Sequence, residues 1–161
     1  MIESSEVVRV ADRDADDACI ALWAAAVAAR DDLPEDPAVR ARAAAKFAAE
    51  RVALVVVPGE RRPRGFALVT APGTGGPEGP ADAAYLSLLA VDPDAQGAGT
   101  GRALLTAAVE AARAAGYRQC VLHALEDNAP ALRLYRSAGF VPVGAPFPHA
   151  LNGRPTRSYL A

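Results

Sequence analysis

The chain has 161 residues and a formal net charge of −2, from 17 basic and 19 acidic side chains. This length suffices for one domain with its own core and is too short for two, and the near-neutral balance excludes a protein that binds nucleic acid or an anionic membrane through a general positive field. Apolar residues make up 52% of the chain, but 39 residues are alanine, so large apolar side chains are few.

Two features predict a cytoplasmic protein without a membrane anchor. The longest uninterrupted apolar run, Ala18–Ala29, has twelve residues, whereas a helix that spans a bilayer needs about 20. The first ten residues, MIESSEVVRV, carry acids where a signal peptide carries positive charge. Cys19 and Cys120 lie far apart within apolar stretches, which indicates two buried thiols and neither a disulfide framework nor a metal site.

The first half of the chain predicts, in order, a short strand, two helices and an antiparallel hairpin, at 6–10, 12–30, 38–50, 52–57 and 65–70. The acids before position 18 are suited to cap and open the first helix. The segment DDLPEDP then breaks the helical pattern. The hairpin strands are rich in valine and are separated by a turn that contains proline and glycine.

The second half alternates strands and helices after a flexible loop at 72–80, which has seven glycines and prolines in nine positions. The predicted elements are a strand, a helix, a strand, a helix and two closing strands, at 85–91, 99–115, 120–125, 128–139, 140–144 and 157–160. Strands that are both consecutive and helix-separated predict a single α/β domain. Its mixed central sheet has about six to seven strands, with helices on both faces.

The most informative stretch is VDPDAQGAGTGRALL, 91–105, where a buried strand runs into a glycine-rich turn and then into an amphipathic helix. Gly97, Gly99 and Gly101 allow backbone N–H groups to converge in front of the positive end of the helix dipole, which favours an anion site. The alternative is tight strand-to-helix packing without a ligand. A P-loop is excluded because no lysine follows the last glycine, and a dinucleotide fingerprint because Arg102 occupies the third glycine position.

Two segments resemble the GNAT superfamily of N-acetyltransferases. QGAGTG, Gln96–Gly101, matches that superfamily's Q/R-x-x-G-x-G/A signature, and NAPALRLYRSAGF, Asn128–Phe140, is similar to its N-x-x-A-x-x-x-Y-x-x-x-G-F segment. The two lie in the expected order, and the predicted element order agrees across nearly the whole chain. The resemblance implies a single N-acetyltransferase domain over 1–161 with a GNAT-like fold, acetyl-coenzyme A (acetyl-CoA) as co-substrate, and no metal.

The resemblance also implies which residues hold the cofactor. The free backbone groups of Leu89 and Val91 would bind the pantetheine arm and polarise the thioester carbonyl, because the family's sheet splays beside this strand. Asn128 would contact the same arm, and it also fits simple helix capping. The Arg102 guanidinium would add a charged contact. The pyrophosphate would lie on the backbone N–H groups of Gln96, Gly97, Ala98, Gly99, Thr100, Gly101 and Arg102.

Tyr135 and His123 are the candidate catalytic residues. Tyr135 shares a helix face with Asn128, and in the family a tyrosine here is the general acid that protonates the departing thiolate; the alternative is a tyrosine packed against the sheet with its hydroxyl in water. His123 is the leading candidate for the general base that a protonated amine requires, against an interpretation as a core histidine. Glu126 and Asp82 are weaker candidates.

These features predict an enzyme that transfers acetyl from acetyl-CoA to a primary amine of a small molecule or peptide, by direct attack in a ternary complex. Neither cysteine has an activating partner nearby in sequence, which disfavours a covalent acetyl-enzyme. The alternative is a regulatory module that binds acyl-CoA with little or no transfer. The acceptor, the acyl length and a homodimer, which is common in the family, stay open.

Three segments are candidate parts of the acceptor site. The acidic turn at 31–36 would either attract a cationic amine or form a solvated loop with helix caps. The loops at 72–80 and 147–155 are candidate lids, and neither contains a residue that specifies a substrate.

Overall fold

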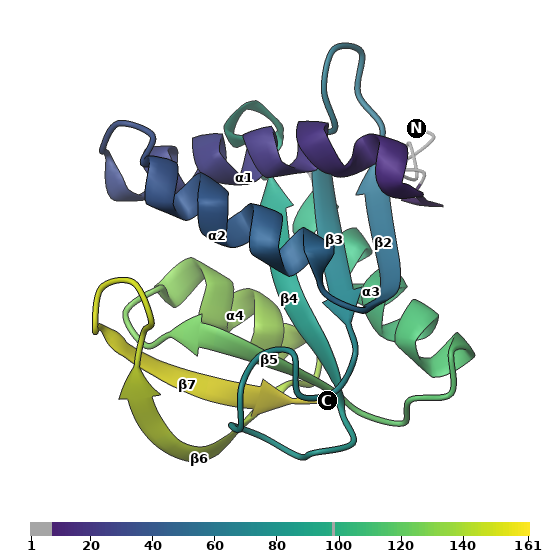
Figure 1. The fold of residues 1–161 in the computed structure, drawn as a ribbon, viewed down its shortest axis with the longest axis vertical. Helices are drawn as coiled ribbons and strands as arrows, with labels where there is room; N and C mark the ends of the chain where they lie inside the picture. Colours follow the sequence, from purple (N-terminus) through teal and green to yellow (C-terminus); the bar gives the residue numbers. More distant parts are fainter. Residues whose placement is uncertain (1–7, 98) are drawn as a thin grey trace.

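The computed structural model describes residues 8–97 and 99–161, which form one seven-stranded sheet with helices on both faces (Figure 1). The strands lie side by side in the order β1-β2-β3-β4-β5-β7-β6, and every neighbouring pair is antiparallel except β4 and β5. Their bounds are β1 Arg9–Val10, β2 Arg51–Val57, β3 Gly65–Thr70, β4 Ala84–Val91, β5 Cys120–Leu125, β6 Val141–Pro148 and β7 Pro155–Leu160. The predicted fold class is confirmed, while Glu6 and Val7 of the predicted first strand and Ala98 of the predicted pyrophosphate site lie outside the described residues.

Four α-helices connect these strands in the predicted order: α1 Asp16–Asp31, α2 Pro37–Ala48, α3 Thr100–Ala114 and α4 Ala129–Ser137. Short 3-10 turns, η1 Arg13–Ala15 and η2 Pro93–Ala95, precede α1 and follow β4. Side-chain caps explain two of the helix starts: Asp36 accepts a hydrogen bond from the Ala38 N–H at 2.9 Å, and Asn128 accepts one from the Ala131 N–H at 3.4 Å.

Two apolar clusters cover the two faces of the sheet. On one face α1 and α2 bury Cys19, Leu22, Ala43 and Phe47 against β2, β3 and β4. On the other face α3 buries Leu104, Leu105, Ala108 and Ala112, and α4 packs Leu132, Leu134 and Tyr135 alongside them. Successive residues of a strand point to opposite faces, so this division decides on which side of the sheet each site residue acts.

The parallel pairing of β4 with β5 covers only the first three residues of β4. Ala84, Tyr85 and Leu86 pair with Cys120, Val121 and Leu122, and the pairing ends there. Figure 1 shows the two strands starting together near the C-terminus and then separating, β4 toward α1 and β5 away from it. We call this break in backbone pairing, between 87–91 of β4 and 123–125 of β5, the sheet gap.

A β-bulge lies where the sheet gap begins. On β3, Leu68 pairs with Leu88 and the next residue, Val69, pairs with Leu86, so Ser87 is an extra residue of β4. A bulge re-aims the residues that follow it. The extra residue shifts the alternation of the β4 backbone by one position. After Ser87, the residues whose N–H and C=O groups face the gap are therefore those that would have faced β3 without the bulge.

The bounds of one segment differ from the prediction, and a second segment makes contacts that the sequence did not indicate. β6 extends to Pro148 because a register shift between Val143 and Phe147 lets it pair again with β7, so Phe147 belongs to a strand and not to a loop. The loop at 72–80, predicted to be flexible, packs on the sheet: a Cβ at Gly75 would lie 2.5 Å from the Tyr85 ring, and one at Gly79 would lie 2.9 Å from Val121. Glycine permits this close approach.

We expect Gly65→Ala to destabilise the fold by about 1–3 kcal/mol, the usual effect of overpacking. An added Cβ would lie 2.7 Å from Leu104 Cδ1 and 2.9 Å from the Ala90 backbone oxygen, and a strand backbone cannot move aside. Gly101→Ala is the matched control, because its Cβ would meet only side-chain ends, Leu134 Cδ2 at 3.2 Å and Val91 Cγ2 at an ordinary 3.6 Å. Urea unfolding of both variants measures the difference, and equal stability of the two would contradict this account.

Candidate functional site

The glycine-rich turn follows the end of β4, which an ion pair holds in place. Asp92, the next residue, accepts hydrogen bonds from the Arg62 guanidinium at 2.6 and 3.0 Å and from the Asp94 N–H at 3.0 Å. The bond from Arg62 lowers the pKa of the Asp92 carboxyl, so it is ionised at neutral pH. This ion pair joins the β2–β3 turn to η2 and positions the segment that begins at Gln96.

Glycine is required in the turn for two different reasons. Gly97 and Gly99 have φ of 89° and 81°, the left-handed region, and an added Cβ at either would meet nothing within 4 Å. Gly101 instead allows close approach to Leu134 of α4. Gly99 precedes α3 without a side-chain cap, so the first N–H groups of the helix face the space before it, as an anion site requires.

The remaining predicted cradle residues differ in what they can offer. Thr100 is 1% exposed and its methyl group lies near Gly65 of β3, so only its backbone can face a ligand. Gln96 and Arg102 are exposed, and Arg102 lines a shallow surface hollow with Thr106 on the outer face of α3. Ala98 lies outside the described residues.

The N–H groups of Leu89 and Val91 point toward the sheet gap. The Asp92 N–H donates to the Arg64 carbonyl at 2.7 Å, on the β3 side. Backbone groups alternate in direction along a strand, so the N–H groups of Leu89 and Val91 point to the other side, where β5 no longer pairs with β4. The bulge described above sets this alternation.

Tyr135 lies half-buried on α4, with its ring 6.2 Å from the ring of Phe140. Its hydroxyl makes no hydrogen bond to the described residues 8–97 and 99–161. Burial raises the pKa of Tyr135 to about 12, and the nearby Tyr85 adds to this shift. The hydroxyl is therefore protonated at neutral pH, as a proton donor must be.

Asn128 uses only part of its side chain to cap α4. Its oxygen accepts from the Ala131 N–H at 3.4 Å, while no described residue accepts a hydrogen bond from its amide nitrogen. The predicted capping role is confirmed, and the amide N–H groups stay available to a ligand.

His123 lies on the opposite face of the sheet from Tyr135. Its neighbours in β5, Leu122 and Ala124, belong to the cluster under α3 and α4, so the His123 side chain points to the α2 side. The ring contacts Tyr85 and Phe147, each at 5.0 Å between centroids, and Nδ1 lies 3.4 Å from the Tyr85 hydroxyl.

The His123 ring is neutral at pH 7. Burial lowers its pKa below the ordinary value; the Glu78 backbone and carboxylate oppose the shift, whereas Lys46 and Arg42 reinforce it. A neutral imidazole has one nitrogen free to accept a proton. The other two candidates for a base are placed less well: Glu126 is exposed and 3.7 Å from Arg157, and Asp82 is exposed at the paired end of β4, away from the sheet gap.

Sequence reasoning missed two basic residues of α2 that face the same region. Lys46 Nζ donates to the Ser87 carbonyl at 3.2 Å and to the Tyr85 hydroxyl at 3.5 Å. Arg42 lies one helical turn earlier, 2.9 Å from His149 Nε2 in the β6–β7 turn. The i, i+4 spacing of these cations, with the helix anchored by Phe47, was the signal in the sequence.

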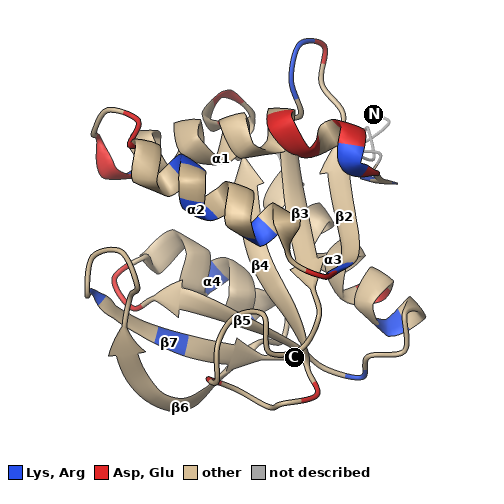
Figure 2. Ribbon diagram, viewed as in Figure 1, with Lys and Arg blue, Asp and Glu red and all other residues tan. Residues whose placement is uncertain are grey.

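The acidic turn at 31–36 supplies caps and surface ion pairs, in agreement with the solvated-loop alternative. Asp31 pairs with Arg30 at 3.0 Å, Glu35 with Arg40 at 3.8 Å, and Asp36 caps α2. In Figure 2 the acids lie at the tip of this turn, whereas basic residues lie along α2.

The two cysteines are buried and unbonded, as predicted. Burial raises the pKa of each thiol to about 12, so neither is a thiolate nucleophile at neutral pH. Within the described part of the chain, no group of three or more His, Cys, Asp or Glu side chains is arranged to hold a metal ion. No helix there combines the length and apolar character that a membrane crossing needs.

Comparison with known proteins adds a family match. The family model described as Acetyltransferase (GNAT) family matches residues 17–140. Mycothiol acetyltransferase of Geodermatophilus obscurus is 45% identical over 65 residues, 40% of this chain and 21% of that protein. The protein of the same name from Saccharomonospora viridis is 47% identical over 53 residues, 33% of this chain and 17% of its own length. The match thus spans about a fifth of these relatives.

Solved structures share the fold over nearly the whole chain. The ribosomal-protein-S18-alanine N-acetyltransferase of Escherichia coli superposes with a TM-score of 0.70 at 22% identity, covering 96% of this chain and 91% of that one. A Salmonella typhimurium protein solved with its cofactor acetyl-CoA superposes with a TM-score of 0.67 at 21% identity, covering 96% and 92%.

Proposed function

Because the chain belongs to the acetyltransferase (GNAT) family, we propose that it transfers an acetyl group from acetyl-CoA to the primary amine of an acceptor, by direct attack in a ternary complex. The N–C bond forms as the C–S bond breaks, the amine gives up a proton, and the departing sulfur receives one. One observation supports the proposal: the protonated Tyr135 hydroxyl and the neutral His123 ring lie on opposite faces of the sheet, and His123 belongs to the part of β5 that does not pair with β4.

The residues present fit acetyl-CoA. The uncapped start of α3 and the turn at 96–102 offer backbone N–H groups to a pyrophosphate. The N–H groups of Leu89 and Val91 face the sheet gap, where an extended amide-containing arm would complete the pairing that β5 leaves unmade. When bound, acetyl-CoA supplies the activated thioester.

Two side chains then transfer the protons, one as donor and one as acceptor. Tyr135, protonated because its pKa is raised to about 12, donates to the departing sulfur. His123, neutral at pH 7, accepts a proton from the ammonium group of the acceptor, which leaves a free amine to attack; Nδ1 of the ring faces the Tyr85 hydroxyl. The buried thiols take no part.

The alternative function is a module that binds acyl-CoA without efficient transfer. Titration calorimetry with acetyl-CoA tests the cradle, and thiol release measured against amines, amino acids, peptides and aminoglycosides tests transfer. Binding together with turnover of at least one amine supports the enzyme. Binding with no turnover across the panel supports the module, and absence of binding overturns both.

The pH dependence of kcat/KM tests His123. Its pKa is lowered from the ordinary value of about 6.5, so the ring is protonated and inactive as a base only at more acidic pH. We expect the rate to rise with pH along a limb whose midpoint lies below 6.5, and His123→Gln to remove that limb and lower the rate about 10²–10⁴-fold. An unchanged profile in the variant would end this role, while Asp82→Asn serves as the neutral control.

A further inference from the structure

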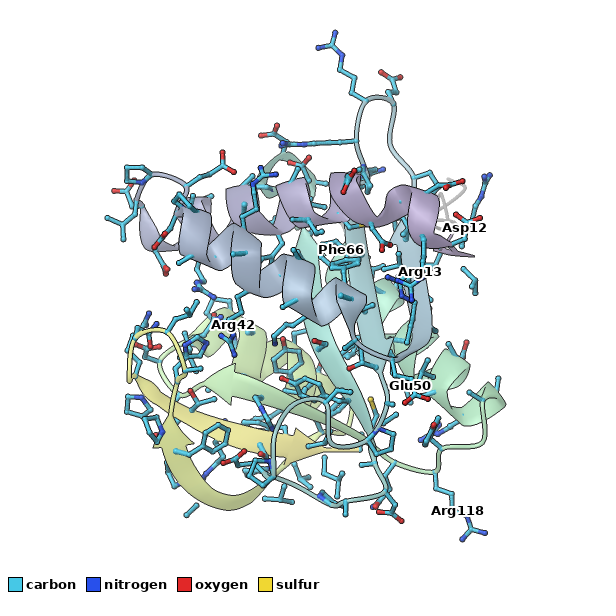
Figure 3. The ribbon with its side chains drawn as sticks, viewed as in Figure 1. Asp12, Arg13, Arg42, Glu50, Phe66 and Arg118 are labelled. Atoms are coloured by element: carbon cyan, nitrogen blue, oxygen red, sulfur yellow. The ribbon has the colours of Figure 1, made fainter. Side chains whose placement is uncertain are left out.

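Arg42 and Lys46 form a pair of cations on the face of α2 that borders the sheet gap. They are four residues apart, so both point the same way. Figure 3 shows Arg42 extending from α2 toward the half of the molecule that contains α4 and β5–β7. Lys46 reaches Ser87, the residue at which β4 leaves β5, and its ammonium lies 5.4 Å from the centre of the Tyr85 ring.

Neither cation has an anionic partner. No carboxylate in 8–97 or 99–161 lies within 4 Å of Arg42 or Lys46, although seven other arginines of that part of the chain have one: Arg13, Arg30, Arg40, Arg51, Arg62, Arg154 and Arg157. Burial, followed by repulsion from Arg42, lowers the pKa of Lys46 to about 8. A partly buried cation without a counter-charge is unfavourable, and a ligand carboxylate would supply that charge.

The present partner of Arg42 is one that a ligand can displace. Arg42 donates to His149 Nε2 at 2.9 Å, while the Leu151 N–H donates to Nδ1 of the same ring at 3.1 Å. A neutral imidazole accepts at one nitrogen only, and an imidazolium at neither. One of the two contacts therefore lacks an acceptor, and a carboxylate is a better acceptor for a guanidinium than this ring.

The cation pair is also close to the proposed base. Lys46 Nζ lies 3.5 Å from the Tyr85 hydroxyl, which lies 3.4 Å from His123 Nδ1. An acidic group held by Arg42 and Lys46 would thus place the rest of a small molecule beside His123. Glu78 acts electrostatically on Tyr85 and His123 but is not within 4 Å of either cation, so it does not fill the role.

We propose that the acceptor is a small amine that also carries a carboxylate, and that Arg42 and Lys46 bind this carboxylate and determine specificity. The planar guanidinium of Arg42 suits a carboxylate in bidentate geometry. This inference rests on the proposed function, because it identifies the substrate of that same site.

The test compares amino acids with their own primary amides, which have the same size without the charge. Glycine, β-alanine, 4-aminobutyrate and 6-aminohexanoate, each also as its amide, are titrated into the CoA-loaded protein and then assayed for turnover with acetyl-CoA. For at least one pair we expect the acid to be preferred by about tenfold or more, consistent with a charged hydrogen bond. In Arg42→Gln this preference falls to about twofold, mainly through a higher KM for the acid.

Three further measurements separate the outcomes. Arg40→Gln, an exposed neighbour on α2 that pairs with Glu35, should keep the full preference, and in the wild type added salt should reduce it, a readout that needs no variant. 3-Aminopropylphosphonate distinguishes a carboxylate site from a phosphate site: binding tighter than that of 4-aminobutyrate overturns the assignment to carboxylate. Equal binding of every acid and amide pair, or a preference retained in Arg42→Gln, also overturns the proposal. If acids bind through Arg42 but no amine is turned over, the proposed transferase activity is contradicted and the proposed carboxylate site is supported.

Discussion

Tyr135→Phe should lower kcat by about 10²–10⁴-fold, the range that a positioned general acid contributes. The substitution removes one oxygen that makes no hydrogen bond to the described residues 8–97 and 99–161, and it keeps the ring that packs against Phe140. We therefore expect the free energy of unfolding and the affinity for acetyl-CoA to change little. Thiol release against the best amine of the panel measures kcat, and calorimetry measures the affinity.

Tyr117→Phe is the matched control for this experiment. Tyr117 is half-buried against the same cluster under α3 but lies at the far end of that helix from the glycine-rich turn. Its variant should retain full activity. If Tyr135→Phe kept more than about a tenth of the wild-type kcat, a donor other than Tyr135, such as water, would be supplying the proton.

Gly99→Val should weaken acetyl-CoA binding by about tenfold or more. At φ 81° a branched residue is strained by about 1–3 kcal/mol, and relief of that strain turns the N–H groups before α3 away from a common point. The added side chain would also stand in the open space where an added Cβ now meets nothing within 4 Å. Titration calorimetry with acetyl-CoA measures the loss.

Gly116→Val separates the loss of the cradle from backbone strain. Gly116 follows the other end of α3, with φ of 98° and open space around an added Cβ. Both variants should lose similar stability in urea unfolding, yet only Gly99→Val should lose affinity for acetyl-CoA. Equal affinity in the two would mean that the turn at 96–102 is not the pyrophosphate site.

The elements of the fold could be predicted because their signals are local. The hairpin strands 52–57 and 65–70 stand between clear turn residues, and Asn128 caps α4 within its own sequence neighbourhood. The boundaries of β6 could not be predicted, because a register shift at Val143–Phe147 depends on its partner β7. The sequence pattern of a single strand does not show which strand it pairs with or in which register.

The candidate site likewise has parts that could be predicted from the sequence and parts that could not. The glycine-rich turn and the segment at 128–140 are continuous in sequence and could be found there. The cation pair could not, since Lys46 meets Tyr85 and Ser87 across about forty residues, and Arg42 meets His149 across more than a hundred. The carboxylate preference proposed above depends wholly on these long-range contacts. The acidic turn, for which the sequence left both a cation-attracting site and a solvated loop open, uses its charges locally.

The position of Tyr135 and His123 on opposite faces has a consequence for inhibitor design. In the proposed function, acetyl-CoA would reach the reacting atoms past α3 and α4, and the amine acceptor would reach them past α2. A compound that joins both ligands in one molecule would have to pass between β4 and β5. The linker between its two halves would therefore have to be as thin as an extended chain. Bulky groups would then fit only at its two ends, where a carboxylate near Arg42 would add selectivity over proteins that lack these cations.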